Sequence, residues 1–272
     1  MPELPEVETV VRGIQPALTG RAIENVWLDW APSLVMPDVQ SFIARIRGQR
    51  IQAVTRRAKY IVIKLDADYL IIHLKMTGRL YVVPADTQYD ADRWVHFRFG
   101  LGDGRELRFS DARKFGRVYL TADASEVLGK LGPEPLADDF TWADFAARLA
   151  KRKGTLKPLL LNQAFIAGIG NIYADEALHL AHIHPQRRSD TLRPEEITAL
   201  YNAIREVLHK GIARQGASIN WYRRPDGTRG AMQDDFFAYG RTGAPCRTCG
   251  QGTIEKIVVA QRSTHFCPRC QK

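Results

Sequence analysis

Four cysteines near the end of the chain constrain its fold more than any other feature. They form two C-x-x-C pairs separated by seventeen residues: Cys246 and Cys249, then Cys267 and Cys270. Each pair can lie on a tight turn and direct two thiolates at one ion, which is the spacing of a four-cysteine zinc site. Four thiolates leave no open coordination position, so we expect one structural Zn²⁺ per chain rather than a catalytic one. Disulfides are the alternative, and the lack of a visible secretion signal disfavours them.

The segment around these cysteines is basic and has the pattern of strands. Residues 253–266 alternate well enough to form the two strands of a ribbon. Between Tyr239 and Lys272 there are six cations and a single acid, Glu255, in a chain of net charge +9. A basic surplus of this kind favours a polyanionic partner, and the ribbon is expected to present its cations to phosphates.

The remaining hydrophobic pattern predicts an α+β protein in several parts. Apolar residues from Leu4 to Leu18 follow helical spacing, and residues 21–120 have the character of β structure. Val95–Leu101 alternates with period two before an Asp103-Gly104 hairpin signal. We expect an N-terminal helix plus β-sandwich over 1–130, a linker at 131–138, a helical domain over 139–238, and the zinc ribbon over 239–272. Helices are predicted at about 141–152, 156–163, 171–181 and 194–214, and a polar, mobile loop at 217–232.

The composition is that of an ordinary soluble protein. The chain has 272 residues, of which 45% are hydrophobic and 25% are charged. No apolar run approaches the roughly 20 residues needed to cross a bilayer. The acidic N-terminus lacks the apolar region of a signal peptide. We therefore expect a cytoplasmic monomer without a membrane partner.

The first residues combine a possible nucleophile with two carboxylates. Bacterial aminopeptidases usually remove an initiator Met before a residue as small as Pro, which would leave a secondary amine at Pro2. An α-amino group has a pKa near ~8, so far more of it is neutral at pH 7 than of a lysine. A neutral amine forms a Schiff base with a sugar aldehyde, and Glu3 and Glu6 follow as acid or base candidates. The structural alternative is an ordinary helix start with Pro in its first turn.

Two internal segments have the composition of nucleic-acid contacts. Gly168-Ile169-Gly170-Asn171 joins two predicted helices, and Asn171 opens the second, where free N–H groups favour a phosphate. Phe115 lies among cations on a probable turn, as a base-stacking wedge would. Each has a structural alternative, namely a helix cap with a tight corner and a phenylalanine packed on the sandwich. Met76 would ordinarily be a core residue, and Lys59 a solvated strand flank.

Three motifs together resemble one enzyme family. These are the opening Pro2-Glu3-Leu4-Pro5-Glu6-Val7-Glu8-Thr9, the Gly168–Tyr173 turn and the terminal four-cysteine finger. In this order and at these distances they look like formamidopyrimidine-DNA glycosylases, bacterial bifunctional enzymes that remove oxidised purines from DNA. The match covers the whole chain. Its Leu-Pro-Glu-Val-Glu-Thr start resembles the purine-lesion branch more than the endonuclease VIII branch.

The resemblance implies roles at the matching positions. Pro2 matches the N-terminal nucleophile, Glu3 the catalytic acid and Glu6 a further active-site carboxylate. Lys59 and Arg262 match phosphate-binding residues of the active site and the finger. The predicted catalytic residues are therefore Pro2, Glu3, Lys59 and Arg262.

Further matches concern DNA. Met76, Arg113 and Phe115 match a trio that fills the gap left by an extruded nucleotide, with Arg113 facing the orphaned cytosine. Asn171 and Tyr239 match phosphate contacts, and Lys157 a lysine linked to lesion recognition. The predicted DNA-binding residues are Met76, His96, Arg113, Phe115, Lys157, Asn171 and Tyr239.

Two departures from the family pattern stand out. Ala58 replaces the usual Gly before the lysine, which an extended strand would tolerate. The loop at 217–232 is rich in Arg and holds Trp221; the family closes this loop over the extruded base.

The resemblance implies an enzyme that excises 8-oxoguanine and formamidopyrimidines from duplex DNA. It also implies cleavage of the abasic site by β,δ-elimination through a Pro2 Schiff base. The expected partner is duplex DNA that carries oxidised bases or abasic sites. One alternative is an endonuclease VIII-like glycosylase for oxidised pyrimidines. The other is a non-catalytic zinc-ribbon protein, which the intact Pro2 and Glu3 disfavour.

Overall fold

The computed structural model describes residues 1–272, apart from the side chain of Asp90. The chain divides into two compact units, which we call unit 1 (Met1–Lys130 with Gln215–Gly230) and unit 2 (Leu131–Arg214 with Ala231–Lys272). The segment Gln215–Gly230 therefore returns to the first unit after the last long helix. Within the described residues, no helix has both the length and the apolar character needed to cross a membrane.

Unit 1 contains two sheets. The first has four antiparallel strands in the order β1-β7-β8-β6, and the second has five in the order β2-β9-β5-β4-β3, with β2 parallel to β9. The strands of the first sheet are β1 (Ile23–Leu28), β6 (Gly78–Pro84), β7 (Val95–Leu101) and β8 (Arg105–Asp111). Those of the second are β2 (Leu34–Met36), β3 (Ala53–Arg57), β4 (Tyr60–Lys64), β5 (Tyr69–His73) and β9 (Arg117–Thr121). Unit 1 also contains the short helical turns η1 (Ala31–Ser33) and η2 (Asp90–Trp94) and the short helix α3 (Ser125–Leu128).

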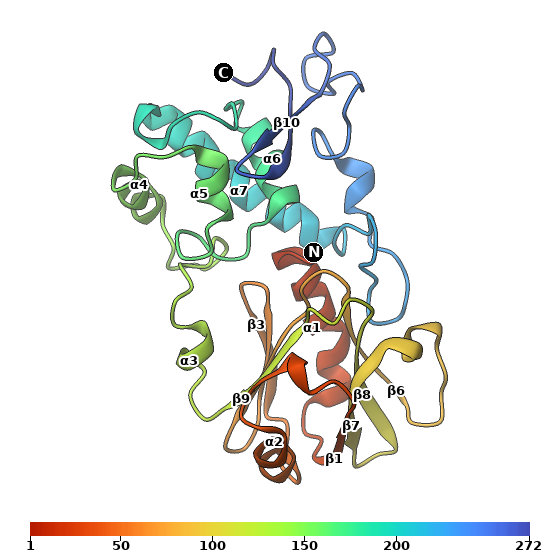
Figure 1. Ribbon diagram of the computed structural model, residues 1–272. Coiled ribbons are helices and arrows are strands. Elements are labelled where there is room, and N and C mark those ends of the chain that lie inside the picture. The colour runs from red at the N-terminus through yellow and green to blue at the C-terminus, as the bar shows by residue number, and fades with distance from the viewer. The chain divides into compact units, whose positions relative to one another are not determined.

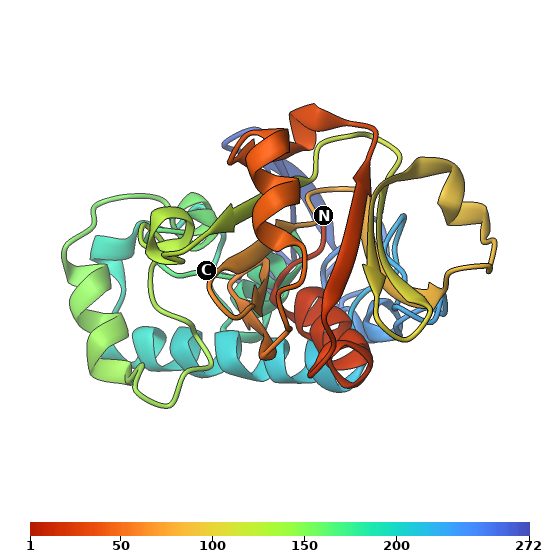
Figure 2. The same ribbon diagram turned by 90° about the horizontal axis from the view of Figure 1, so that it is seen from below.

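Helix α1 (Leu4–Leu18) joins the two sheets into one core. It contacts β3 and β4 of one sheet and β6 of the other (Figures 1 and 2). Its apolar face is buried in a cluster with residues from both sheets, such as Ile61 and Phe109. Burying one such side chain stabilises a fold by about 1.5–3 kcal/mol relative to exposure. The predicted helix-led β-sandwich is confirmed.

The expectation of uninterrupted β structure over 21–120 is wrong at helix α2 (Val39–Ile46). The Asp38 side chain accepts a hydrogen bond from the backbone N–H of Ser41 at 3.0 Å, which is an N-cap contact. Phe42 and Ile46, four residues apart, are both buried on the sandwich core. Two buried residues and a cap suffice for a short helix, but they are too few to stand out from the surrounding strand pattern.

Unit 2 contains the predicted helices, each within a few residues of its expected ends. They are α4 (Trp142–Ala150), α5 (Leu156–Leu161), α6 (Asn171–Leu180) and α7 (Pro194–Ala213), with short turns η3 (Ser189–Thr191) and η4 (Met232–Asp235). The ribbon is an antiparallel pair, β10 (Glu255–Val259) and β11 (Arg262–Phe266). The two residues between these strands, Ala260 and Gln261, both have positive φ, as a tight hairpin turn requires.

The loop predicted at 217–232 largely coincides with the segment 215–230, whose aromatic side chains pack on unit 1. It has neither helix nor strand, but Tyr222 is buried in the core cluster of unit 1. The Tyr222 hydroxyl donates to the carbonyl oxygen of Gln215 at 3.1 Å. Trp221 lies edge-to-face on Trp94, with ring centroids 5.7 Å apart. An aromatic pair of this geometry stabilises a contact beyond its buried area, so the loop is packed onto unit 1.

Candidate functional site

The first turn of α1 holds the two predicted carboxylates out of solvent. Glu3 is 2% exposed and Glu6 is 1% exposed, and Pro2 beside them is also buried. One Glu6 oxygen accepts the backbone N–H of Glu3 at 2.8 Å, and the other accepts that of Ala217 at 2.8 Å. Both Glu6 oxygens thus accept backbone N–H groups, so the side chain holds these two backbone segments in place. The contact joins the start of α1 to the segment 215–230, and no spacing in the sequence indicated it.

Lys59 lies in the tight turn between β3 and β4, where it is buried. The expectation that Ala58 sits in an extended strand is wrong, because its φ of 53° is in the left-handed region that favours glycine. Arg56 stabilises the turn by donating to the Ala58 carbonyl oxygen at 3.1 Å. Its Nε also binds Glu8 of α1 at 3.0 Å, so the turn that carries Lys59 is tied to helix α1.

Glu8 is held as a carboxylate by this contact and by a second arginine. Although burial opposes it, hydrogen bonds from Arg12 and Arg56 lower the pKa of Glu8 below its ordinary value. Arg12 is bound at 2.7 Å and Arg56 at 3.0 Å. Glu8 is therefore a bridge between helix and sheet, and its charge is already paired.

His73 is a neighbour of Lys59 that the sequence analysis missed. Burial, followed by the positive charges of Lys75 and Lys59, lowers the pKa of His73 to about 3. Its Nδ1 accepts the backbone N–H of Lys75 at 2.9 Å, so the ring is neutral and carries its proton on Nε2. Tyr60 packs edge-on against it at 4.6 Å. What brings His73 close to Lys59 is the register of β4 with β5, in which Tyr60, the residue after Lys59, faces His73.

The three residues of the predicted wedge meet on two neighbouring turns. Met76 follows β5 and Phe115 follows β8, and each is 44% exposed. The Arg113 guanidinium lies 4.7 Å from the centre of the Phe115 ring and 3.4 Å from the Met76 sulfur. The structural alternatives, a core Met76 and a packed Phe115, do not agree with this exposure. An exposed apolar pair with an arginine between them has the composition of a stacking surface.

His96, another predicted DNA contact, lies inside unit 1. Its ring is buried, with Nδ1 2.7 Å from an Asp29 carboxylate oxygen and Nε2 3.2 Å from the Asp111 carbonyl oxygen. Both ring nitrogens thus have protein partners. A direct contact of His96 with DNA stays a prediction.

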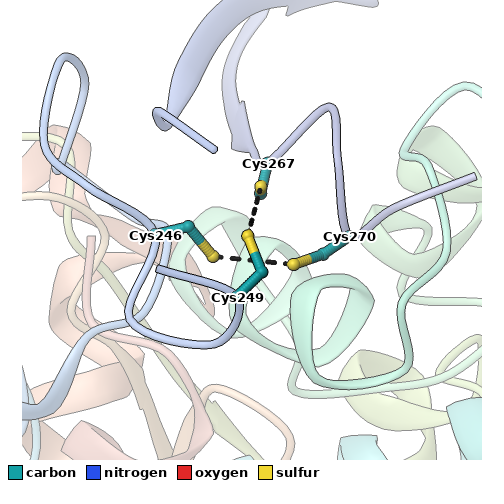
Figure 3. A group of neighbouring side chains, drawn as sticks. All are labelled: Cys246, Cys249, Cys267 and Cys270. Atoms are coloured by element: carbon teal, nitrogen blue, oxygen red, sulfur yellow. Dashed lines mark hydrogen bonds between the residues drawn. The ribbon is translucent and has the colours of Figure 1, made fainter. Parts of the chain in front are cut away.

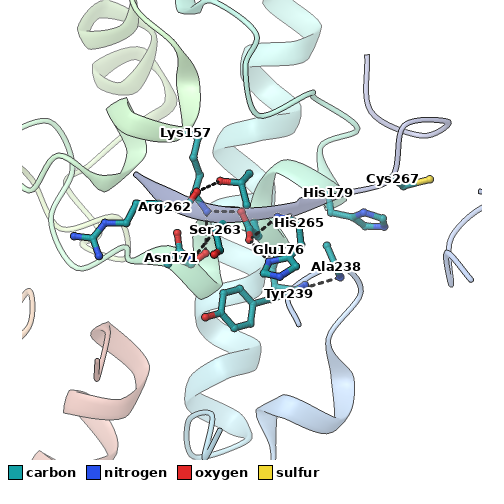
Figure 4. A network of polar contacts seen from close by, with 12 residues as sticks. Lys157, Asn171, Glu176, His179, Ala238, Tyr239, Arg262, Ser263, His265 and Cys267 are labelled. Atoms are coloured by element: carbon teal, nitrogen blue, oxygen red, sulfur yellow. Dashed lines mark hydrogen bonds and ion pairs between the residues drawn. The ribbon is translucent and has the colours of Figure 1, made fainter. Parts of the chain in front are cut away.

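In unit 2, helix α6 carries the predicted phosphate contacts. Asn171 opens this helix, and its Nδ2 donates to the Ser263 carbonyl oxygen of β11 at 2.8 Å. Arg262, the neighbour of Ser263, is exposed. Tyr239 packs on His265 of the same strand at 5.0 Å. Figure 4 shows Asn171, Arg262 and Tyr239 within the network of polar contacts around α6 and β11. The structure thus gathers three predicted phosphate contacts around the first turn of a helix, where N–H groups and the dipole favour an anion.

Lys157 contacts the start of α6 from the buried interior of unit 2. Its side chain is 0% exposed and forms an ion pair with Asp175, while its Nζ donates to the Asn171 carbonyl oxygen at 3.0 Å. The second oxygen of Asp175 accepts the backbone N–H and Nδ1 of His265, each at 3.0 Å. In this arrangement Lys157 contacts the backbone of Asn171, the first residue of α6. A direct contact stays a prediction.

Glu176 and His179 extend the network toward the finger (Figure 4). Glu176 accepts three successive backbone N–H groups, from Phe237 at 2.9 Å, Ala238 at 2.9 Å and Tyr239 at 2.8 Å. His179 binds the side chain of Gln271 at 3.1 Å through Nδ1. One face of α6 therefore fixes the segment before the finger and its last residues.

The four cysteines form a compact cluster that fits one structural zinc ion. Their sulfurs lie within 4.8 Å of one another, with Cys246 3.6 Å from Cys270 and Cys249 3.9 Å from Cys267 (Figure 3). A tetrahedral site with Zn–S bonds of about 2.3 Å separates its sulfurs by about 3.8 Å. A disulfide would need about 2.05 Å. Disulfide bonding is therefore excluded, and the predicted zinc site is confirmed.

Comparisons with known proteins agree with this arrangement. Three family models match successive parts of the chain. The formamidopyrimidine-DNA glycosylase N-terminal domain matches residues 1–118, the H2TH domain of the same enzymes matches 131–223, and a zinc finger found in FPG and IleRS matches 243–272. Together they account for most of the sequence.

Curated relatives match over the full length. Formamidopyrimidine-DNA glycosylase of Chloroflexus aurantiacus is 50% identical, with 100% of this chain and 98% of the relative covered. The same enzyme of Chloroflexus aggregans is 52% identical with the same coverage. A solved structure of Lactococcus lactis Fpg with DNA containing Fapy-dG has a TM-score of 0.90 at 36% identity, covering 99% of this chain and 100% of that chain. Another, with abasic-site DNA, has a TM-score of 0.90 at 36% identity, covering 99% of each chain.

Proposed function

Because the chain belongs to the formamidopyrimidine-DNA glycosylase family, we propose that it excises oxidised purines from duplex DNA and then cleaves the abasic site. The observation that carries the proposal is the start of α1, where Pro2 and Glu3 are buried and Glu6 is fixed by two backbone donors. The Lactococcus relative is solved with Fapy-dG and with abasic DNA, which supports this substrate class.

The reaction begins with access to the base. A damaged base cannot be attacked within the stack, so it is first extruded at a cost of a few kcal/mol. Met76 and Phe115 fill the gap, and Arg113 faces the base left behind. Lys59 in unit 1 and Arg262 and Asn171 in unit 2 bind phosphates. Such contacts position the enzyme without reading sequence.

The chemistry then uses the N-terminal amine. Once the exposed Met1 is removed, neutral Pro2 attacks C1′ of the sugar, and the base leaves with a proton. Glu3 is the acid that assists both the departure of the base and the opening of the sugar ring, and loss of the ring oxygen's bond to C1′ leaves an iminium at Pro2. The iminium acidifies the C2′ proton, so removal of that proton breaks the C3′–O bond. A second elimination breaks the C5′–O bond, and hydrolysis of the iminium frees Pro2. The zinc ion holds the finger and takes no part in these steps.

Borohydride trapping tests this proposal most directly. We expect borohydride to link the Pro2 amine to DNA carrying 8-oxoguanine, and mass spectrometry to map the crosslink to that residue. Pro2→Gly should slow both base release and strand cleavage but keep an amine, whereas Glu3→Gln should mainly block base release. Glu3→Gln should still trap a preformed abasic site, which serves as the matched control.

The same experiment separates the alternatives. A crosslink mapped only to a lysine contradicts the nucleophile. Trapping only with oxidised pyrimidines favours an endonuclease VIII-like enzyme. No trapping with any lesion, alongside normal DNA binding, indicates a non-catalytic DNA-binding protein.

A further inference from the structure

The two turns that carry Met76 and Phe115 share an unusual backbone feature. Lys75, directly before Met76, has a φ of 51°, and Lys114, directly before Phe115, has a φ of 59°. Left-handed backbone is unfavourable for a residue with a side chain, so other contacts must hold both turns in this form. In each turn the left-handed lysine precedes the apolar residue that is directed outward.

A buried pair, Thr77 and Asp111, connects the two turns. Asp111 is 0% exposed, and one of its oxygens accepts a hydrogen bond from the Thr77 hydroxyl. The other oxygen accepts the backbone N–H of Gly116 at 2.6 Å. The backbone N–H of Arg113 points at the pair, 3.2 Å from the Thr77 Oγ1 and 3.3 Å from the Asp111 oxygen. Two side chains therefore fix the backbone on both sides of Lys114 and Phe115.

Close packing leaves little room for another arrangement of these turns. A Cβ atom on Gly116 would lie 2.3 Å from the Phe109 ring, and one on Gly78 would lie 2.4 Å from the Leu74 carbonyl oxygen. Gly78 and Asp111 are also register partners at the ends of β6 and β8. The Asp111 carbonyl oxygen accepts the backbone N–H of Lys114 at 3.1 Å and also contacts His96 Nε2 at 3.2 Å, which adds to the contacts that hold this residue.

We propose that Asp111 and Thr77 are positioning residues that join the two turns into one rigid wedge, so that Met76 and Phe115 enter the base stack together. The inference rests on the proposed function, since it presumes that the wedge acts on DNA. A group that is already ordered loses less entropy on insertion, so more of its contact energy offsets the unstacking of bases. Neither residue needs to touch DNA for this effect.

The test compares Thr77→Val, which removes the hydroxyl, with Thr77→Ser, which keeps it. Ser110→Ala is the matched control, because it removes a buried hydroxyl beside Asp111 on β8 whose partner, the Ala91 carbonyl oxygen, lies outside both turns. In the free protein, hydrogen exchange at the amides of Arg113 and Gly116 should become faster in Thr77→Val only. The preference for a duplex with a tetrahydrofuran abasic site over undamaged duplex should fall about tenfold, the size of one lost hydrogen bond to a charged group. Thr77→Ser and Ser110→Ala should keep that preference.

A double-variant cycle decides whether the effect passes through the wedge. If it does, Thr77→Val should cause no further loss in a Phe115→Ala background. Additive losses, or unchanged exchange and preference in Thr77→Val while Phe115→Ala loses the preference, overturn the positioning role. If Phe115→Ala itself keeps the full preference, the wedge of the proposed function fails, and the role of the pair on DNA fails with it.

Discussion

At the scale of single residues, the surroundings of His73 fix its protonation state. Burial and two nearby lysines, Lys75 and Lys59, disfavour a third positive charge, so the pKa of His73 falls to about 3. Because the ring is neutral, it adds no positive charge to those of Lys59 and Lys75. The buried ring also makes the stability of unit 1 depend on pH, because unfolding returns His73 to an ordinary value near 6.5.

We expect unfolding to reveal this linkage. Between pH 6.5 and about 3 the unfolded chain binds a proton at His73 that the folded chain does not. The contribution of His73 is therefore complete above pH 6.5 and is lost as pH falls, by about 1.4 kcal/mol per pH unit. Urea unfolding of the wild type and of His73→Gln at pH 7, 6 and 5 measures it. Subtracting the two series removes the shared carboxylates, and identical pH slopes would contradict the assignment.

The residue scale also shows where sequence reasoning ends. Pro2, Glu3 and the wedge trio were predicted because their types and order repeat a family pattern. The expectation of an extended Ala58 was wrong, because the left-handed conformation of a single residue leaves no periodic signal in the sequence. A glycine at this position would have indicated such a conformation, but an alanine does not. The bond from Ala217 to Glu6 joins residues 211 apart in sequence. Pairings of that separation are set by how the elements pack.

At the scale of elements, three segments of unit 2 meet on one buried ion pair. Lys157 of α5 and Asp175 of α6 are both buried, and Asp175 also holds His265 of β11. The helices and the ribbon follow from hydrophobic period and cysteine spacing, and both were predicted. The contacts that hold the helices and the ribbon to one another depend on single buried polar side chains, and hydrophobic periodicity in the sequence does not reveal these. Lys157 was predicted from the resemblance alone, without its partner.

Breaking this pair from one side should be costly. Lys157→Met leaves Asp175 charged and buried, and we expect the free energy of unfolding of unit 2 to fall by about 3–5 kcal/mol. The double variant Lys157→Met with Asp175→Asn removes the orphaned charge and keeps an oxygen for His265, so it should recover part of the loss. Urea unfolding followed by segment-resolved hydrogen exchange measures both. A double variant less stable than Lys157→Met would show that the charge of Asp175 is needed by His265 as well.

At the scale of the whole molecule, the two units have separate sources of stability. Unit 1 has a large apolar core formed by α1 and both sheets. The finger has a small apolar cluster of Cys246, Ile254 and Cys267, so its fold depends on the metal. Zinc binding to four thiolates contributes about 10–16 kcal/mol in isolated fingers, which is far more than such a cluster provides. Removal of the metal should therefore unfold the finger and leave unit 1 folded.

We expect Cys267→Ser, or chelation of the zinc, to unfold residues 246–272 while the strands of unit 1 stay protected from hydrogen exchange. Protection should also weaken at the first turn of α6, because Asn171 and Asp175 lose their partners on β11. Arg262 would then no longer be held beside Asn171, so the slope of log K against log[salt] for duplex DNA should fall by about 0.9. Restoring zinc to the chelated wild type should recover the slope and the protection together. Loss of protection throughout β4 and β5 would instead mean that the units share one cooperative fold, and an unchanged salt slope would remove Arg262 from the phosphate contacts.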